Sequence, residues 1–234
     1  MPRAKEAAHD LTRPVFTRGL FQFLKDLAAH NDREWFAANR DRYEADVKLP
    51  MAAFIMAFGE PLAGLSRNFV ADPRGNGGSM FRINRDTRFS GNKDPYKTNV
   101  GAQFRHKDCT RDVHAPGFYL HLEPGCSFAG AGLWRPDPPG LHKVRESIVA
   151  RARAWKAIKD AGIEVTGDTL VRVPAGFDPA HRFAEDLKLK DFYTHTPLTD
   201  KEVLAPDFLE RFTAICREAA PLMAFLTKAM ELDW

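Results

Sequence analysis

The sequence predicts an α+β fold: a central, mainly antiparallel sheet built from hairpins and packed by N-terminal, middle and C-terminal helices. Apolar residues recur at helical spacing near both ends of the chain, whereas short β-like segments cluster near its centre. Strands and helices do not alternate along the sequence, as they would in a doubly wound parallel sheet. We therefore expect a single globular domain over residues 16–234, preceded by a flexible tail over residues 1–15.

Three helices are predicted before residue 67. Thr17 can cap the first, because leucine and phenylalanine side chains follow it on one helical stripe. Asn31 is followed three residues later by a glutamate, in the manner of a capping box, and predicts a second helix that ends at Pro50. The apolar segment 51–66 predicts a third, buried helix that is bent or stopped at Pro61.

The middle of the chain predicts the sheet. A loop over residues 72–79 precedes four β-like segments, at residues 80–84, 98–104, 118–123 and 127–134. The last two are joined by the sequence Glu-Pro-Gly-Cys, which is typical of a tight turn.

The C-terminal part predicts a helix over residues 141–161 that covers one face of the sheet. Two short extended segments follow, near residues 169–173 and 192–195. A final helix begins at Pro206, and Pro221 predicts a kink within it.

Positive charge is concentrated in one segment. The whole chain has a formal net charge of +3, but residues 67–112 hold ten lysines and arginines against five aspartates, a local charge of +5. Such a segment attracts phosphates, carboxylates or a nucleic-acid backbone. The modest overall charge argues against a protein that coats nucleic acid broadly.

Other sequence features concern the compartment. No apolar run approaches the roughly 20 residues of a membrane-spanning helix, so no membrane partner is predicted. The amino-terminal residues contain no apolar segment of the secretory type. Three cysteines, an odd number without a CxxC pair, predict the reducing cytoplasm. These cysteines are Cys109, Cys126 and Cys216.

The densest polar segment has the sequence RINRDTRFSGNKDPYK and spans residues 82–97. Its charged and polar side chains are Arg82, Arg85, Asp86, Arg88, Asn92, Lys93, Tyr96 and Lys97. Arginine binds phosphate or carboxylate through paired hydrogen bonds, lysine adds a point charge, and an ionised Asp86 would orient one arginine. The segment predicts an anion-binding site; the alternative is a surface loop whose charges pair with one another.

The predicted hairpin supplies a second group of candidate residues. By strict alternation Tyr119, His121 and Glu123 share one strand face, opposite an apolar face. His121 can act as a general base oriented by Glu123, because imidazole titrates near neutral pH. The alternative is a solvated outer face. On the next strand Gly130 and Gly132 leave room for a ligand.

Trp134 and Arg135 end that strand. They are candidates to stack on and pair with a planar or anionic group, but a core position is the favoured interpretation for Trp134. His106, Cys109 and His114 match no zinc-binding spacing, and no P-loop is present. No metal site is predicted, and the sequence indicates no particular cofactor.

These motifs resemble the bacterial domain-of-unknown-function 2461 family. The resemblance covers most of the chain and lies in NDREWF, in RINRDTRFSGNKDPYK, in GFYLHLEPG with GLWRPD, and in VPAGFD with EDLKLKDF. The family signature falls on Arg82, Arg85, Asp86, Arg88, Phe89, Asn92, Lys93 and Tyr96. The resemblance implies a single globular bacterial domain and no mechanism.

Three hypotheses follow for the function. The favoured one is an enzyme or binding protein for a small anionic ligand, in which Arg85, Arg88 and Lys93 hold a phosphate or carboxylate while His121 or Tyr96 transfers protons. The second is a non-catalytic module that binds nucleic acid or a protein partner through the basic segment. The third is an internal ion-pair network that locks strands to helices without any ligand.

Overall fold

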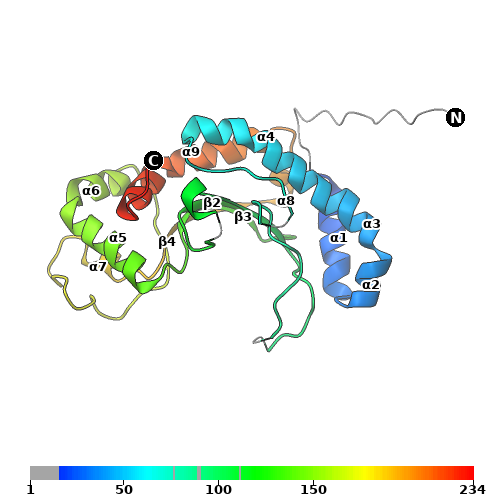
Figure 1. Ribbon diagram of the computed structural model, residues 1–234, viewed down its shortest axis with the longest axis horizontal. Helices are drawn as coiled ribbons and strands as arrows, with labels where there is room; N and C mark the ends of the chain where they lie inside the picture. Colours follow the sequence, from blue (N-terminus) through cyan, green and yellow to red (C-terminus); the bar gives the residue numbers. More distant parts are fainter. Residues whose placement is uncertain (1–15, 76, 89–90, 111) are drawn as a thin grey trace.

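A four-stranded antiparallel sheet lies at the centre of the structure, in the order β1-β2-β3-β4 (Figure 1). Its strands are β1 Val100–Arg105, β2 Gly117–Leu122, β3 Ser127–Leu133 and β4 Phe192–Leu198. The computed structural model describes residues 16–75, 77–88, 91–110 and 112–234, so the predicted tail lies outside the described residues. Each strand pairs with its neighbour in sequence, which confirms the predicted α+β fold with a hairpin-built sheet.

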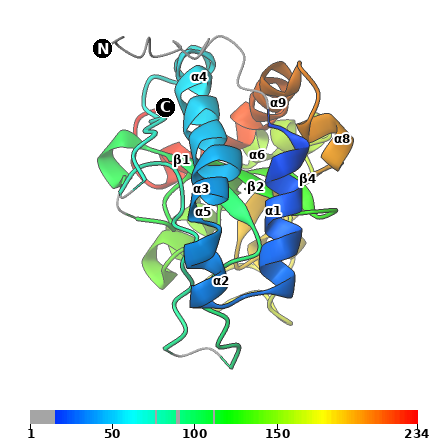
Figure 2. The same cartoon turned by 90° about the vertical axis from the view of Figure 1, so that its right-hand side faces the viewer.

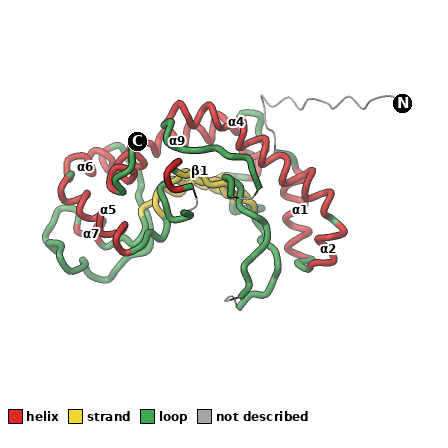
Figure 3. The backbone as a smooth tube through the Cα atoms, in the orientation of Figure 1, coloured by secondary structure: helices red, strands yellow, loops and turns green. Residues whose placement is uncertain are grey.

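Helices cover one face of the sheet and flank its two ends (Figures 1 and 3). The long helices α4 and α9 lie over one face, α1 to α3 stand beyond one end, and α5 to α7 stand beyond the other. The α-helices are α1 Arg18–Ala29, α2 Arg33–Ala38, α3 Arg40–Tyr43, α4 Leu49–Leu65, α5 Pro138–Ala150, α6 Ala152–Asp160, α7 Ala184–Leu187, α8 Asp200–Val203 and α9 Phe208–Ala229. A π-helical turn, Glu44–Lys48, joins α3 to α4, and a 3-10 turn, Lys107–Cys109, follows β1. No helix of the described chain lies across the opposite sheet face, which we call the open face.

Alternation along β2 separates the two faces. Phe118, Leu120 and Leu122 are fully buried, whereas Tyr119 and His121 are only partly buried. The buried side chains belong to a core that includes residues of α4 and α9. Burying each large apolar side chain contributes roughly 1.5–3 kcal/mol, so the sheet is held with its polar residues on the open face.

Helix α9 passes through both hydrophobic cores. Phe208 and Phe212 pack with Phe54 of α4 in the first core. Further along the helix, Phe225 packs on Trp155 of α6 in the second core, with ring centroids 5.0 Å apart. Because both cores share this helix, α5 and α6 are tied to the same framework as α4.

The N-terminal helices stand in front of the sheet in Figure 2, with α1 beside the run from α2 to α4. Thr17 caps α1 as predicted, because its side chain accepts a hydrogen bond from the Gly19 amide. The predicted cap of the second helix is wrong by one residue: Asp32, rather than Asn31, accepts the Trp35 amide at 2.8 Å.

Asn31 instead joins the helices to the segment before β1. Its side-chain amide donates to the Tyr96 carbonyl at 3.0 Å, and its side-chain oxygen accepts the Tyr96 amide at 3.1 Å. The Tyr96 ring stacks on Phe36 of α2 with centroids 4.1 Å apart. These contacts hold the Tyr96 segment, which continues into β1, against α2.

Three further predicted helix boundaries, at Pro50, Pro61 and within residues 141–161, differ in the structure. Helix α4 includes Pro50 in its first turn, where an amide donor is dispensable, and continues past Pro61 because buried side chains lie on both sides of that proline. The predicted helix 141–161 breaks at Arg151, where the backbone leaves helical geometry, and forms α5 and α6.

Two predicted strands are isolated bridges instead. Residues 80–84 form single bridges to Ala102 and Tyr96, and residues 169–173 form one bridge, to Leu189. The first of these segments runs along the edge of β1 at Met80 and then turns away. The chain there forms two paired arms rather than a further strand of the sheet.

Replacing Asn31 with alanine should lower the free energy of unfolding by about 1–3 kcal/mol, because both polar backbone groups of Tyr96 lose their partner. Urea unfolding of the full chain measures this loss. Asn31→Asp keeps the acceptor and loses the donor, so it should lie between wild type and Asn31→Ala. Equal stability of wild type and Asn31→Ala would contradict a role for this pair in fastening the segment.

Candidate functional site

Three neighbouring cavities lie along the open face of the sheet and its flank. The basic cavity, about 550 Å³, lies between residues 33–48 and residues 80–84. The aromatic cavity, about 400 Å³, lies over the strands and beside Trp134. The histidine cavity, about 630 Å³, contains His121 and Glu123. The first two share Phe81, and the last two share residues of β3 and β4, so the three form a row.

The basic cavity collects cationic side chains from two parts of the chain. Arg33, Arg40 and Lys48 come from the helical run, and Arg82 comes from the opposite wall. Among the described lining residues Glu44 is the one carboxylate, and it accepts a hydrogen bond from Lys48 at 2.9 Å. The described lining therefore has an excess of three positive charges.

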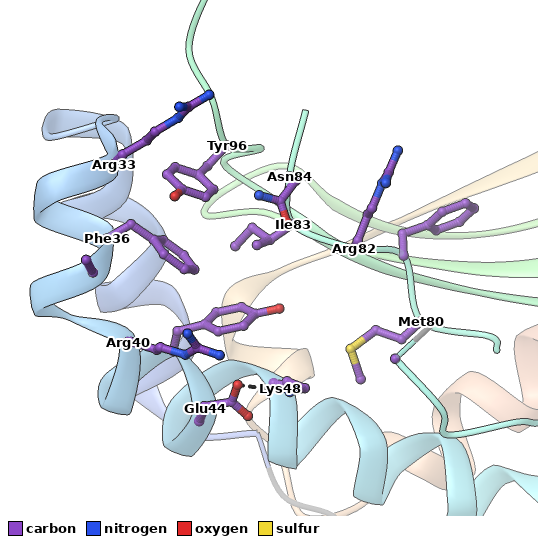
Figure 4. Close-up of a pocket in the computed structure, with 14 residues that line it drawn as sticks. Arg33, Phe36, Arg40, Glu44, Lys48, Met80, Arg82, Ile83, Asn84 and Tyr96 are labelled. Carbon is purple, nitrogen blue, oxygen red and sulfur yellow. Dashed lines mark hydrogen bonds and ion pairs between the residues drawn. The ribbon is translucent and has the colours of Figure 1, made fainter. Parts of the chain in front are cut away.

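Helical periodicity explains the wall formed by residues 33–48. Residues 33, 36, 37, 40, 43, 44 and 48 line the cavity, a spacing of three or four that places side chains on one helical face. In Figure 4, Phe36 points from this wall toward Ile83 and Arg40 extends to the same side below it, while the Arg33 and Arg82 side chains extend upward, away from Glu44. Sequence reasoning missed these cations, although their spacing relative to Phe36 was visible.

Two tyrosines bring phenol groups to the basic cavity. Burial raises the pKa of Tyr43 to about 12, with the nearby Glu44 charge adding to the shift, so its phenol is neutral at physiological pH. Tyr96 is buried against Phe36, and its backbone is held by Asn31. A neutral phenol is a hydrogen-bond donor suited to an anionic oxygen.

The hairpin holds a histidine within a hydrogen-bonded group. His121 Nδ1 lies 3.0 Å from the Tyr119 hydroxyl, and His121 Nε2 lies 3.2 Å from Glu123 Oε2. The Asn99 side-chain nitrogen lies 3.1–3.2 Å from both ring nitrogens, and Thr98 donates to the other Glu123 oxygen at 3.2 Å. The His121 side chain is 11% exposed, so it is largely buried.

The protonation states of this group follow from burial. Burial raises the pKa of Tyr119 to about 12, and Glu123 adds to that shift. Burial also lowers the pKa of His121, although the hydrogen bond and charge of Glu123 oppose the effect. A neutral phenol then donates to Nδ1, and Nε2–H donates to the carboxylate, which fixes one tautomer. Since Nδ1 already accepts from the phenol, a further proton would reach this imidazole through the Tyr119 hydroxyl.

Gly101 makes the Tyr119–His121 contact possible. It pairs with His121 across β1 and β2, and a Cβ atom there would lie 2.7 Å from the Tyr119 hydroxyl. Any larger residue would push the phenol away from the imidazole. Next to this group, Phe128 stacks on His121 with centroids 4.7 Å apart and contacts His195 at 4.4 Å.

The residues of the basic segment are divided between the cavity wall and a second group, which we call the projecting loop and which holds Asp86, Arg88, Asn92 and Lys93. Arg82 and Tyr96 line the basic cavity. Lys97 is half-buried with its Nζ 5.4 Å from the Phe81 ring centroid. Burial lowers the pKa of Lys97, and the charges of Arg82 and Arg85 lower it further, so these three cations are close enough to repel one another.

The projecting loop extends away from the sheet in Figure 1. Arg88 donates from Nε and Nη2 to the two Asp86 oxygens at 3.0 and 2.6 Å, and this interaction holds the pKa of Asp86 at about 2. Lys93 donates to the Thr87 carbonyl at 3.1 Å, and the Asn92 side chain accepts the amide two residues on. These contacts join neighbours within one loop.

The remaining predicted residues lie beside the aromatic cavity. Trp134 lines that cavity and is 52% exposed, so the core position favoured for it from the sequence is wrong. The Arg135 guanidinium lies 4.8 Å from the Trp134 ring centroid. The structure thus brings Arg82 and Tyr96 together with the helical cations and places His121 with Glu123. Phe89 lies outside the described residues. The binding and catalytic roles that the sequence analysis gave to the candidate site residues stay predictions.

A family model described as "Conserved hypothetical protein (DUF2461)" matches residues 19–225. The chain belongs to the DUF2461 family. The matched range includes the described walls of all three cavities, and the family description names no activity. No curated protein matches this DUF2461 chain.

Within its described residues, no helix has both the length and the apolar character needed to cross a membrane.

In this DUF2461 protein, His121 should titrate below pH 6.5, because burial disfavours the imidazolium. Glu123→Gln should lower the pKa of His121 further, since the carboxylate favours the charged ring. Imidazole NMR signals followed against pH measure both values. The other histidines serve as internal controls, and an unchanged or raised His121 pKa in Glu123→Gln would contradict the proposed contact.

The same shift has a consequence for stability. Below pH 6.5 the unfolded chain binds a proton at this histidine more readily than the folded chain does. The His121 contribution to stability is therefore complete above pH 6.5 and declines as the pH falls through the folded pKa.

Proposed function

We propose that this protein binds a small anion carrying a phosphate or carboxylate in the basic cavity. The observation that supports the proposal is the excess positive charge of the described lining, which holds four cations, Arg33, Arg40, Lys48 and Arg82, and one carboxylate, Glu44, already paired with Lys48. Gathering like charges destabilises the empty site, and an anion relieves that repulsion.

The walls favour an anion in two further ways. Arginine side chains donate paired hydrogen bonds to planar or tetrahedral anions, and the Tyr43 and Tyr96 hydroxyls add further donors. Phe36 and Ile83 are apolar parts of the lining, and they reduce the screening of these charges by water. Lys97 and Arg85 extend the positive field next to the cavity.

Acid–base catalysis on a ligand that extends from the basic cavity toward the histidine cavity is the second candidate function. The observation that favours it is the oriented, neutral imidazole of His121, held by Tyr119 and Glu123 on the open face. In this scheme the Tyr119 hydroxyl gives its proton to His121 Nδ1 while it accepts one from the ligand, and Glu123 stabilises the imidazolium that forms. Asp86 keeps an orienting role toward Arg88, in line with its low pKa.

Binding of nucleic acid is the less favoured alternative. Arg88 and Lys93, the loop cations expected to contact phosphates, already make contacts within their own loop. Contacts to a nucleic-acid backbone would have to compete with these interactions. A steep decline of binding with rising salt would support the alternative.

We further infer a bacterial cytoplasmic protein. Cys126 is exposed and Cys109 half-exposed, and all three cysteines are free thiols. Exposed thiols persist in a reducing compartment. The bacterial origin is supported by the sequence motifs alone.

Arg40→Ala and Arg82→Ala should each weaken the binding of inorganic phosphate or citrate about tenfold, the equivalent of about 1.4 kcal/mol. Isothermal titration calorimetry of the full chain at low salt measures these affinities. Without an anion, neither variant should lower the thermal midpoint, because each removes a repelling charge.

Arg153→Ala is the matched control, since Arg153 is an exposed arginine on α6 outside the cavity lining. It should bind both probes with wild-type affinity. The proposal fails when wild type binds neither probe, or when Arg153→Ala loses as much affinity as Arg40→Ala.

A further inference from the structure

The aromatic cavity has walls made of rings and a floor without side chains. The rings are Phe81, Tyr119, Phe128, Trp134 and Tyr193. Three glycines, Gly117, Gly130 and Gly132, also line the cavity on β2 and β3. The cavity has a volume of about 400 Å³, which suits a small molecule.

The glycine floor is fixed by the backbone. Gly130 pairs with Tyr119 on β2 and His195 on β4, and a Cβ atom there would lie 3.0 Å from the Thr194 carbonyl oxygen. Gly132 has a φ of +147°, a conformation that L-residues rarely adopt, and a Cβ atom there would lie 2.1 Å from a β4 carbonyl oxygen. Because side chains are disfavoured at both positions, the floor stays flat.

Phe81 forms the boundary between the aromatic cavity and the basic cavity. It lies along the edge of β1, where its amide donates to the Gly101 carbonyl at 2.9 Å. The Lys97 ammonium and the Arg105 guanidinium each lie 5.4 Å from its ring centroid. The boundary is thus positively charged, while the aromatic cavity beyond it is mainly apolar.

We propose that the aromatic cavity binds a planar aromatic ring belonging to the same ligand whose anionic group occupies the basic cavity. The inference rests on the proposed function. The flat floor and the surrounding rings suit a planar group, and the cations at Phe81 suit an anion attached to it. A nucleoside monophosphate has this chemistry: one heteroaromatic ring joined to one phosphate through a polar linker.

This position also connects the ligand with the hairpin histidine. The Tyr119 ring lines the aromatic cavity, and its hydroxyl lies 3.0 Å from His121 Nδ1. Phe128 lines both the aromatic and the histidine cavities. A ring bound here contacts the residues that orient the imidazole.

Four probes separate the parts of the proposal in calorimetry with the full chain. Ribose 5-phosphate carries the anion alone, adenosine the ring alone, adenosine 5′-monophosphate both, and hexyl phosphate an anion with a flexible apolar chain. The nucleotide should bind at least about tenfold more tightly than ribose 5-phosphate and more tightly than hexyl phosphate.

Two variants test the aromatic cavity itself. Tyr193→Leu and Trp134→Leu should remove most of the advantage of the nucleotide and leave the affinity for ribose 5-phosphate unchanged. Val171→Ala removes an exposed apolar side chain outside the cavity and should change neither affinity. Nucleotide binding should also change tryptophan fluorescence in wild type, and this change should be reduced in Trp134→Leu.

The outcomes distinguish this inference from the proposed function. Equal affinity for the nucleotide and ribose 5-phosphate, or equally tight binding of hexyl phosphate, overturns the aromatic-ring inference and leaves the anion site standing. Absence of binding by every phosphate probe, together with no binding of citrate, overturns the proposed function. Much tighter, steeply salt-dependent binding of a single-stranded oligonucleotide overturns the small-ligand assignment in favour of nucleic acid.

Discussion

The separation of the two sheet faces is the constraint on which the rest of the structure depends. Alternation along β2 buries Phe118 and Leu120 under α4 and α9 and leaves Tyr119 and His121 on the open face. A shift of one residue in the register would exchange the two sets, placing an imidazole among apolar side chains. The free energy that holds the aromatic core together therefore also holds the hydrogen-bonded histidine in place.

Local patterns in the sequence predicted the sheet well and the basic cavity less well. Apolar and polar residues alternate in the sequence over residues 118–122. The strand and the shared face of Tyr119 and His121 could therefore be predicted. The Asn31–Tyr96 pair joins residues 65 positions apart, and no local pattern marks such a contact. The apparent capping box at Asn31 was misleading because the neighbouring Asp32 takes the cap.

The basic segment was recognised as unusual, but its charge density alone did not indicate where the cavity wall would form. Arg88 and Asp86 pair with each other two positions apart, an arrangement that exposed loops adopt readily and that contributes little to stability. Arg82 and Tyr96 take part in the cavity because the paired arms before β1 lie against α2. The cations that the sequence analysis missed, Arg33, Arg40 and Lys48, share a helical stripe with the packed rings Phe36 and Tyr43, and periodicity alone does not separate a cavity wall from a core face.

Stability and ligand binding oppose each other in this arrangement. Lys97 is half-buried near Arg82 and Arg85, and both desolvation and repulsion lower its pKa. A fold tolerates such a cluster only where other contacts hold the backbone, and here the Asn31 hydrogen bonds and the Tyr96–Phe36 stack do so. An anion that neutralises the cluster would remove part of this repulsion and stabilise the folded chain by mass action. The backbone beside Tyr96 is therefore held in position without a ligand, which would lower the conformational entropy lost in the proposed binding.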